Sequence, residues 1–536
     1  MATRRQPLIP GWLWPGLAAS LLMVAVALAA FAALWLNAPQ TDARALLQDS
    51  YLWHVVRFSF WQAFLSALLS VLPAIFLARA LYRRRFPGRL ALLRLCAMTL
   101  ILPVLVAVFG ILSVYGRNGW LAALCRSLGL EWSFSPYGLQ GILLAHIFFN
   151  MPMATRLLLQ ALENIPGEQR QIAAQLNMRG GAFFRLVEWP WLRRQIPPTA
   201  ALIFMLCFAS FATVLSLGGG PQATTIELAI YQALSYDYDP GRAALLALVQ
   251  MICCLGLMLF SQRLSKAIPV GVTQVRGWRD PQDSRISRFT DTLLIGLALL
   301  LLLPPLLAVI VDGVNGSLGD TLRQPALWQA FWTSLRIAVA AGLLCVILTL
   351  MLLWSARELH LRHRRFAGQA LELSGTLILA MPGIVLATGF FLLLNSSIGL
   401  PESADAIVIF TNALMAIPYA LKVLDNPMRD IAARYAPLCA SLDIRGLDRL
   451  RIVELRALRR PIAQALAFAC VLSIGDFGVV ALFGNDQFRT LPFYLYQQIG
   501  SYRSDAGAVT ALLLLLLCFL LFTLIEKFPG RHADTD

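Results

Sequence analysis

Residues 171–180 read QIAAQLNMRG, and residues 437–446 read PLCASLDIRG. The two stretches match at Ala174 and Ala440 and at the Arg-Gly pair that ends each of them. In both, small residues that suit a helical turn precede an Asn or an Asp. After glycine, these residue types most readily adopt a left-handed backbone. Each stretch therefore predicts a short helix, a bend and a second, amphipathic helical segment.

The two stretches belong to a long internal repeat. Residues 152–244 align without a gap onto residues 418–510, with more than twenty identical residues that include glycines, arginines and acids. Apolar composition alone would not select those residue types, so the chain is a duplication. Both stretches lie in loops that are much longer than an ordinary connection.

The composition indicates that the repeats lie in a membrane. Of the 536 residues, 58% are hydrophobic and only 14% are charged, whereas a soluble protein carries roughly a quarter of charged residues. Apolar runs predict twelve membrane spans. They fall at 17–36, 58–78, 95–116, 133–155, 199–217, 243–261, 292–311, 337–356, 373–395, 406–421, 461–483 and 506–525.

The distribution of charge predicts the orientation of these spans. With a cytoplasmic amino terminus, most of the 44 lysines and arginines fall on the cytoplasmic side, as do both repeated loops and the carboxyl terminus. The net charge of +15 is thus explained by cytoplasmic loops beside a lipid bilayer, and it does not call for nucleic acid.

Six spans in each half give both halves the same orientation. We therefore expect an all-α integral membrane protein with two parallel six-helix repeats, related by an axis along the membrane normal. A translocation path along that axis is the functional interpretation, and a duplicated bundle without a path is the alternative. The expected parts are a tail with the first helix at 1–54, the first repeat at 55–262, a connector with the seventh helix at 263–329, the second repeat at 330–527 and a tail at 528–536.

The repeated loops resemble the Glu-Ala-Ala…Gly loop in permease subunits of binding-protein-dependent ABC importers of type I. In that family a proline follows the glycine by thirteen residues, the spacing that Asn177 and Pro190 keep here. The chain departs from the pattern at the glutamate, which is Gln171 in one copy and Pro437 in the other. The resemblance implies that both loops dock onto an ATPase dimer through Gln171, Ala173, Ala174, Asn177, Arg179, Gly180, Cys439, Ala440, Asp443, Arg445 and Gly446.

The fusion of two repeats in one chain resembles the ferric-iron and thiamine branch of this family, and the thiamine permeases above all. That resemblance implies a bacterial inner-membrane permease that carries thiamine and its phosphate esters into the cytoplasm. It also implies two partners: a periplasmic thiamine-binding protein and an ATPase that binds ATP and Mg. Three alternatives stay open: a permease for ferric iron or another small solute, an ion-coupled secondary transporter, and a scaffold that transports nothing.

The sequence gives no sign of catalysis. Its three lysines are Lys266, Lys422 and Lys527, and none follows a glycine, so no P-loop is present. The nine cysteines show no C-x-x-C spacing, which favours packing roles over a metal site or disulfides. We expect no catalytic residue, no metal and no cofactor on this chain, with ATP hydrolysed by a partner.

One acid lies inside a predicted span. Asp476 follows Gly475, and Ser210 occupies the same position of the first repeat. Ionisable groups are costly within lipid and are therefore candidates for function. The functional interpretation places Ser210, Phe211, Asp476 and Phe477 at a constriction of the path, where Asp476 would favour a cation. The structural interpretation is a capped acid that orders a helix break, and the residues alone do not decide between the two.

Overall fold

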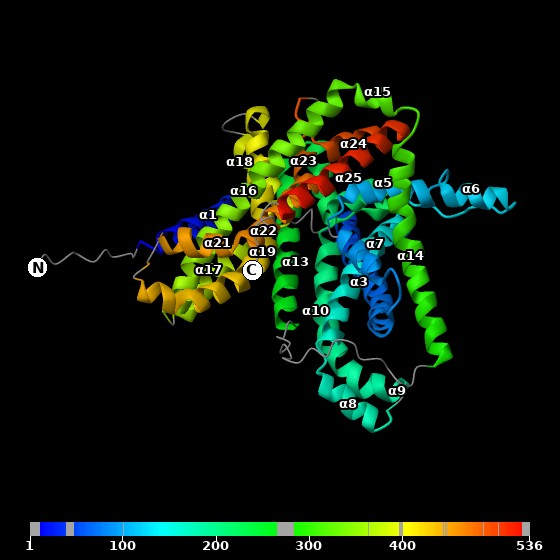
Figure 1. Cartoon of the computed structure of the whole chain (residues 1–536). Coiled ribbons are helices and arrows are strands. Elements are labelled where there is room, and N and C mark those ends of the chain that lie inside the picture. Colours follow the sequence, from blue (N-terminus) through cyan, green and yellow to red (C-terminus); the bar gives the residue numbers. More distant parts are fainter. Residues whose placement is uncertain are drawn as a thin grey trace, which may run out of the picture. The chain divides into compact units, whose positions relative to one another are not determined.

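The computed structural model is helical in every regular element that it describes (Figure 1). The described residues are 11–38, 48–99, 101–178, 180–264, 284–362, 364–395, 400–442, 444, 448–485, 487–501 and 503–527. Within these ranges, nine helices are long and apolar enough to cross a membrane. They are Trp14–Asn37, Ser50–Arg83, Val104–Ser127, Leu139–Glu163, Pro240–Ser261, Arg285–Gly313, Pro325–Leu361, Ala404–Tyr435 and Ser504–Ile525.

Two bent helix pairs raise the number of candidate spans to eleven if each pair is counted as one span. Gly180–Phe208 meets Phe211–Leu217 at 55°, and Arg449–Ala457 meets Arg459–Gly475 at 70°. At the predicted span 373–395 the described residues form only a shorter apolar helix, Gly383–Leu393. The described part of this membrane protein is therefore all-helical and holds nine to eleven candidate spans, against the twelve predicted for the whole chain.

Contacts divide the chain into two compact units. The first-repeat unit consists of Ala45–Ala229 and Cys253–Asn315. Within it, α3 packs against α7 and α10. Its helices are α3 (Ser50–Arg83), α4 (Arg89–Met98), α5 (Val104–Tyr115), α6 (Trp120–Ser127), α7 (Leu139–Glu163), α8 (Gly167–Gln175), α9 (Gly180–Phe183), the π-helix η2 (Phe184–Glu188), α10 (Trp189–Phe208), α11 (Phe211–Leu217), the 3-10 turn η3 (Pro221–Ala223) and α14 (Arg285–Gly313).

The second-repeat unit consists of Met1–Arg44, Ile230–Ile252 and Gly316–Asp536. Within it, α16, α19 and α22 pack against one another. Its helices are α1 (Trp14–Asn37), α15 (Leu318–Leu322), α16 (Pro325–Leu361), α17 (Arg365–Thr376), η4 (Leu377–Ala380), α18 (Gly383–Asn395), α19 (Leu400–Ser441), η5 (Arg449–Glu454), α21 (Leu455–Ala457), α22 (Arg459–Gly475), α23 (Gly478–Phe483), α24 (Leu491–Gly500) and α25 (Ser504–Lys527). The ranges of the two units meet within α12 (Ile226–Ser235) and α13 (Pro240–Leu264).

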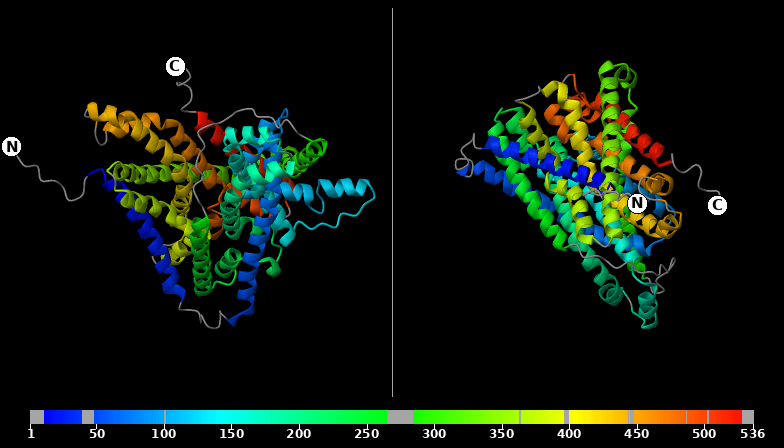
Figure 2. Two further views of the ribbon diagram at one scale, coloured as in Figure 1. Left: turned by 90° about the horizontal axis from the view of Figure 1, so that it is seen from below. Right: turned by 90° about the vertical axis from the view of Figure 1, so that its left-hand side faces the viewer.

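Helix α1 packs within the second-repeat unit, against α16, α17 and α18 (Figure 2). The backbone N–H of Gly16 donates to Ser355 Oγ at 2.9 Å. A Cβ atom on Gly16 would lie 2.3 Å from Ser355 Cβ, and one on Gly389 would lie 2.8 Å from Ala30 Cβ. Small residues thus let α1 approach both neighbours closely, the usual basis of helix association in membranes.

Helix α14, which follows the first repeat in the chain, packs within the first-repeat unit against α5 and α3. A Cβ atom on Gly110 of α5 would lie 2.3 Å from the backbone oxygen of Pro305. At the other end of α14, Asp291 is 2% exposed and accepts from Arg83 and Arg84, each at 2.7 Å. A glycine contact and a buried ion pair therefore fix α14 to this unit.

Candidate functional site

The first predicted docking loop forms a helix, a bend and a second helix. Helix α8 runs over Gly167–Gln175, so it begins and ends earlier than the predicted stretch 171–181. Asn177 has φ +52°, which confirms the predicted left-handed bend, and Gly180 has φ +43°. Arg179 lies outside the described residues. The loop continues through α9 into η2, and Figure 1 shows α8 and α9 beyond the end of α10.

The second loop ends its helix in the same manner. In the first copy Met178 N–H donates to the oxygen of Ala173 at 3.0 Å, and in the second Ile444 N–H donates to the oxygen of Cys439 at 2.9 Å. This closing bond is typical of a helix that ends in a left-handed residue. Asp443, Arg445 and Gly446 lie outside the described residues, and Ala440 is helical.

The two predicted docking helices bury residues at equivalent repeat positions and expose residues at equivalent repeat positions. The inner residues Ala173 and Cys439 are both 2% exposed and occupy equivalent repeat positions. The outer faces carry apolar pairs four residues apart, which places both members of a pair on one side of a helix. These pairs are Ile172 with Leu176, exposed by 55% and 63%, and Leu438 with Leu442, exposed by 51% and 61%.

Sequence reasoning missed these apolar pairs, although the spacing of apolar residues in otherwise polar loops was a usable signal. Gln171 and Ala174 lie on the same exposed side of α8. An exposed apolar pair flanked by polar residues suits a groove on a partner protein. The predicted docking loops thus expose apolar pairs beside the small residues singled out from the sequence.

A buried ion pair anchors the first loop to α3. Arg79 Nε lies 2.5 Å from Glu188 Oε2, and Glu188 is fully buried. The Arg79 guanidinium also lies 4.4 Å from the centre of the Phe184 ring. Arg193 and Arg194 lie close to Glu188 in the sequence. The structure instead gives it a partner on a transmembrane helix.

The second loop carries the equivalent pair. Glu454, at the repeat position of Glu188, is 1% exposed and contacts Arg357 of α16. Arg449 Nε approaches the same carboxylate at 2.9 Å, and Arg357 also donates to Glu358 at 2.7 Å. Both copies therefore join the segment after the docking helix to the end of a long membrane helix by a buried arginine-glutamate contact.

Two helix breaks occupy equivalent positions of the two repeats. In the first, α10 ends at Phe208 and α11 begins at Phe211; in the second, α22 ends at Gly475 and α23 begins at Gly478. Ser210, in the first break, donates from Oγ to the oxygen of Cys207 at 2.8 Å. The predicted path residues thus lie where the transmembrane backbone leaves its helix, a geometry tolerated only away from lipid.

Asp476 lies in the second break, between α22 and α23. Its carboxylate lies against the backbone N–H groups of Gly478, Val479 and Val480, which begin α23, and against the side-chain amide of Asn412. One carboxylate atom, Oδ2, is buried without a hydrogen-bond partner among the described residues. The acid therefore lies at the start of α23, with one carboxylate oxygen unpaired among the described residues.

The two aromatic residues beside the breaks are buried within their own units. Phe211 is 5% exposed and Phe477 is 2% exposed. The Phe477 ring lies 5.0 Å from that of Tyr496 and 6.4 Å from that of Phe493, measured between centroids. These contacts fix Phe477 in position beside Asp476.

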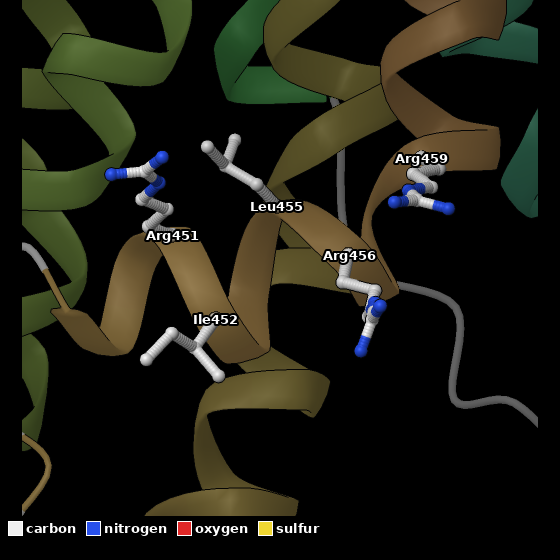
Figure 3. A pocket seen from close by; sticks show the side chains of 5 residues that line it. All are labelled: Arg451, Ile452, Leu455, Arg456 and Arg459. Atoms are coloured by element: carbon white, nitrogen blue, oxygen red, sulfur yellow. The ribbon is translucent and has the colours of Figure 1, made fainter.

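A basic pocket lies beside the second loop (Figure 3). It has a volume of about 350 Å³ and is lined by Arg451, Ile452, Leu455, Arg456 and Arg459. Figure 3 shows the three arginines spread along the segment that leads into α22. Among the described residues, no group of three or more His, Cys, Asp or Glu side chains could hold a metal ion. The candidate functional features are therefore the two predicted docking loops and the two helix breaks.

Comparisons with known proteins agree with this geometry. Residues 70–269 match the family described as "Binding-protein-dependent transport system inner membrane component". Thiamine transport system permease proteins from Escherichia coli and Salmonella typhimurium are 82% and 81% identical to the chain over its 536 residues and their own full lengths. The chain belongs to this family of transport permeases. A third relative, the thiamine transport system permease protein of Haemophilus influenzae, is 43% identical over 492 residues, which cover 92% of this permease and 91% of the relative.

Membership of the family fixes the general role. The permease is a multi-pass component of an inner membrane, and it belongs to a transport system that depends on a binding protein. It is the transport subunit of that system and not an enzyme.

Proposed function

We propose that the permease carries thiamine and its phosphate esters from a periplasmic thiamine-binding protein to the cytoplasm, driven by a separate ATPase dimer that binds ATP and Mg. The observation that carries this proposal is the 82% identity, over the whole chain, to a protein named as a thiamine transport system permease.

The proposed architecture has twelve spans in two parallel six-helix repeats of the type I importer fold, with both termini in the cytoplasm. The two helix breaks at equivalent repeat positions support it, as do the two docking helices with matching faces. The first repeat would occupy 55–262 and the second 330–527. The first helix at 1–54 and the seventh at 263–329 then precede these two segments and complete the six helices of each half.

The docking surfaces give the ATPase its hold on the permease. In this mechanism closure of the ATPase dimer on ATP moves the two docking helices, and this movement rocks the repeats and opens the path toward the periplasm. The exposed pairs Ile172 with Leu176 and Leu438 with Leu442 support the assignment, because their apolar surface is otherwise left to water.

The path would pass the broken spans. Thiamine carries a positive charge, and Asp476 holds a carboxylate oxygen without a hydrogen-bond partner at the second break. Phe211 and Phe477 lie beside the two breaks and would limit the width of the path. Ser210 replaces the acid in the first break, so only one carboxylate would face the substrate.

Transport by the purified complex tests the proposal. The permease, its ATPase and the binding protein are placed in proteoliposomes, and uptake of labelled thiamine, thiamine monophosphate and ferric iron is measured with and without ATP. ATP-dependent uptake of the thiamine compounds alone is the expected result. Uptake of iron would assign the permease to the other branch, and uptake driven by an ion gradient without ATP would show a secondary transporter.

Growth of a deletion strain gives an independent test. On limiting thiamine the strain should grow poorly, and added thiamine or the intact gene should restore growth. Added iron should have no effect. Restoration by iron would contradict the proposed substrate.

A further inference from the structure

We propose that the two buried ion pairs, Arg79 with Glu188 and Arg357 with Glu454, are the joints through which each docking loop moves its membrane helix. The inference rests on the proposed function, and it assigns positioning roles to four residues outside the docking surface and the path.

The placement of the pairs matches such a role. Arg79 lies four residues before the end of α3 at Arg83, and Arg357 lies four residues before the end of α16 at Leu361. Each glutamate ends the π-helix that follows the docking helix, η2 in the first copy and η5 in the second. Each pair therefore connects the docking loop to the end of a long helix within the same unit.

Burial makes these connections stiff. Glu188 and Glu454 are 0% and 1% exposed, so neither carboxylate can exchange its arginine for water without a large penalty. An exposed pair behaves differently: Arg89 and Glu163 are 3.4 Å apart with side chains 28% and 52% exposed, and such a pair separates at little cost. Displacement of a loop must therefore carry the arginine paired with its buried glutamate, and the helix end that bears this arginine.

Each joint has a second attachment. In the first copy the guanidinium of Arg170, on the docking helix α8, lies 4.9 Å from the centre of the Tyr82 ring on α3. Arg170 is only 6% exposed and also donates to the oxygen of Leu162 at 3.0 Å. In the second copy Arg449 adds a second guanidinium to the Glu454 carboxylate. The two copies thus reinforce the same connection with different residues.

The alternative role is purely structural, in which the pairs stabilise the fold and nothing more. The two roles predict different numbers of substrate molecules moved per ATP hydrolysed. Loss of a structural pair lowers uptake and ATP hydrolysis together, since fewer complexes are intact. Loss of a joint lowers the number of substrate molecules moved per ATP hydrolysed, while ATPase binding to the exposed docking surface persists.

The experiment uses the complete complex in proteoliposomes, with permease variants Glu188→Gln and Glu454→Gln and the exposed control Glu163→Gln. Thiamine uptake and ATP hydrolysis are measured on the same vesicles, and bound ATPase is quantified. We expect both buried variants to retain the ATPase and to move about tenfold fewer thiamine molecules per ATP, a change typical of a lost coupling between sites. Glu163→Gln should match the wild type.

Two further variants protect the test against misfolding. Glu188→Asp keeps the charge but shortens the side chain, so uptake per ATP should fall while the thermal midpoint stays close to that of the wild type. The exchange Arg79→Glu with Glu188→Arg restores opposite charges, and it should recover part of the uptake per ATP that Glu188→Gln loses.

Unchanged uptake per ATP in both glutamine variants would overturn the proposal, as would a proportional loss of uptake and hydrolysis in every variant. Failure of the proposed function gives a different result, because the wild-type complex itself would then not take up thiamine. In that event the joint is judged by binding-protein stimulation of ATP hydrolysis, which the glutamine variants should lose and Glu163→Gln should keep.

Discussion

The two repeats differ in how the membrane helix is connected to the predicted docking helix. In the first, α7 ends at Glu163 and α8 begins at Gly167, with Pro166 in an extended conformation between them at ψ 137°. In the second, the single helix α19 runs from Leu400 to Ser441 and includes both the membrane segment and the start of the docking segment. One copy of the docking helix is hinged, and the other is a continuation of its span.

The cause is a two-residue difference. Pro166 and Gly167 occupy the positions of Ala432 and Ala433 in the second repeat. Proline disfavours a helical conformation in the residue before it, and glycine costs more entropy than alanine to hold in a helix. Proline alone is insufficient, because α19 contains three prolines in its interior. The Pro-Gly pair is what separates the docking helix from its span.

Loss of the apolar docking pairs should have the largest effect. Ile172→Glu with Leu176→Glu, or Leu438→Glu with Leu442→Glu, places charges on the surface proposed to bind the ATPase. We expect ATPase binding to fall about tenfold or more for each pair, as for central interface residues. Co-purification in mild detergent measures the effect, and Gln175→Glu, also exposed, is the control. A loss in only one copy would show that the hinged and continuous helices do not contribute equally.

Exchange of the Pro-Gly and Ala-Ala pairs between the two repeats should have the second-largest effect. Ala432→Pro with Ala433→Gly introduces a break into α19 and should destabilise the permease by about 3 kcal/mol, the usual cost of proline within a helix. Pro166→Ala with Gly167→Ala should leave the thermal midpoint nearly unchanged and reduce ATP-dependent uptake, because α8 loses its hinge. Thermal unfolding and uptake are measured on both variants. Equal uptake in the alanine variant and the wild type would show that the hinge is dispensable.

The glycine contacts of α14 and α1 offer a matched pair of smaller effects. Gly110→Ala meets a backbone oxygen of α14, and Gly16→Ala meets the side chain of Ser355. Overpacking of this kind costs about 1 to 3 kcal/mol, and the two variants should lose similar amounts because neither Ser355 Cβ nor the Pro305 oxygen can rotate away. Thermal unfolding provides the measurement. Gly296→Ala is the control, since nothing lies within 4 Å of its Cβ position, and a shift as large in the control would refute the explanation.

Exchange of the residues at the two breaks should have the smallest effect. Asp476→Ser gives the second break the residue of the first, and we expect thiamine uptake at low concentration to fall about fivefold, or roughly 1 kcal/mol. Ser210→Asp tests whether a second acid increases uptake of the cation. Initial rates at several thiamine concentrations measure both changes. Uptake that is indifferent to Asp476→Ser would leave Asp476 with its capping role alone.

The sequence predicted the features that depend on local pattern. The duplication, most spans and the bend at Asn177 follow from identities, apolar runs and the conformational range of asparagine. The break at Asp476 was visible as an acid between glycines. These predictions succeed because each depends on residues that are neighbours in the chain.

Features that depend on distant residues were not predictable in this way. Glu188 has Arg193 and Arg194 nearby in the sequence, yet the structure pairs it with Arg79, 109 residues earlier in the chain. Likewise, an apolar run shows that α1 is a span but not which helices it will contact. The exposed pair Ile172 and Leu176 was missed for another reason. Their spacing places both on one face of the helix, but only the structure shows which face is buried and which is exposed.

The packing of α1 against helices that are synthesised later has a consequence for biosynthesis. Gly16 bonds to a side chain that lies 339 residues later in the chain, so during translation the first helix must wait in the bilayer until most of the protein has been made. Helix α14 is made after the unit into which it packs. Two separately expressed fragments, divided between α13 and α14, would each lack part of a compact unit. The first fragment would lack α14, the second would lack α1 and Ile230–Ile252, and each would need the other to supply the missing part.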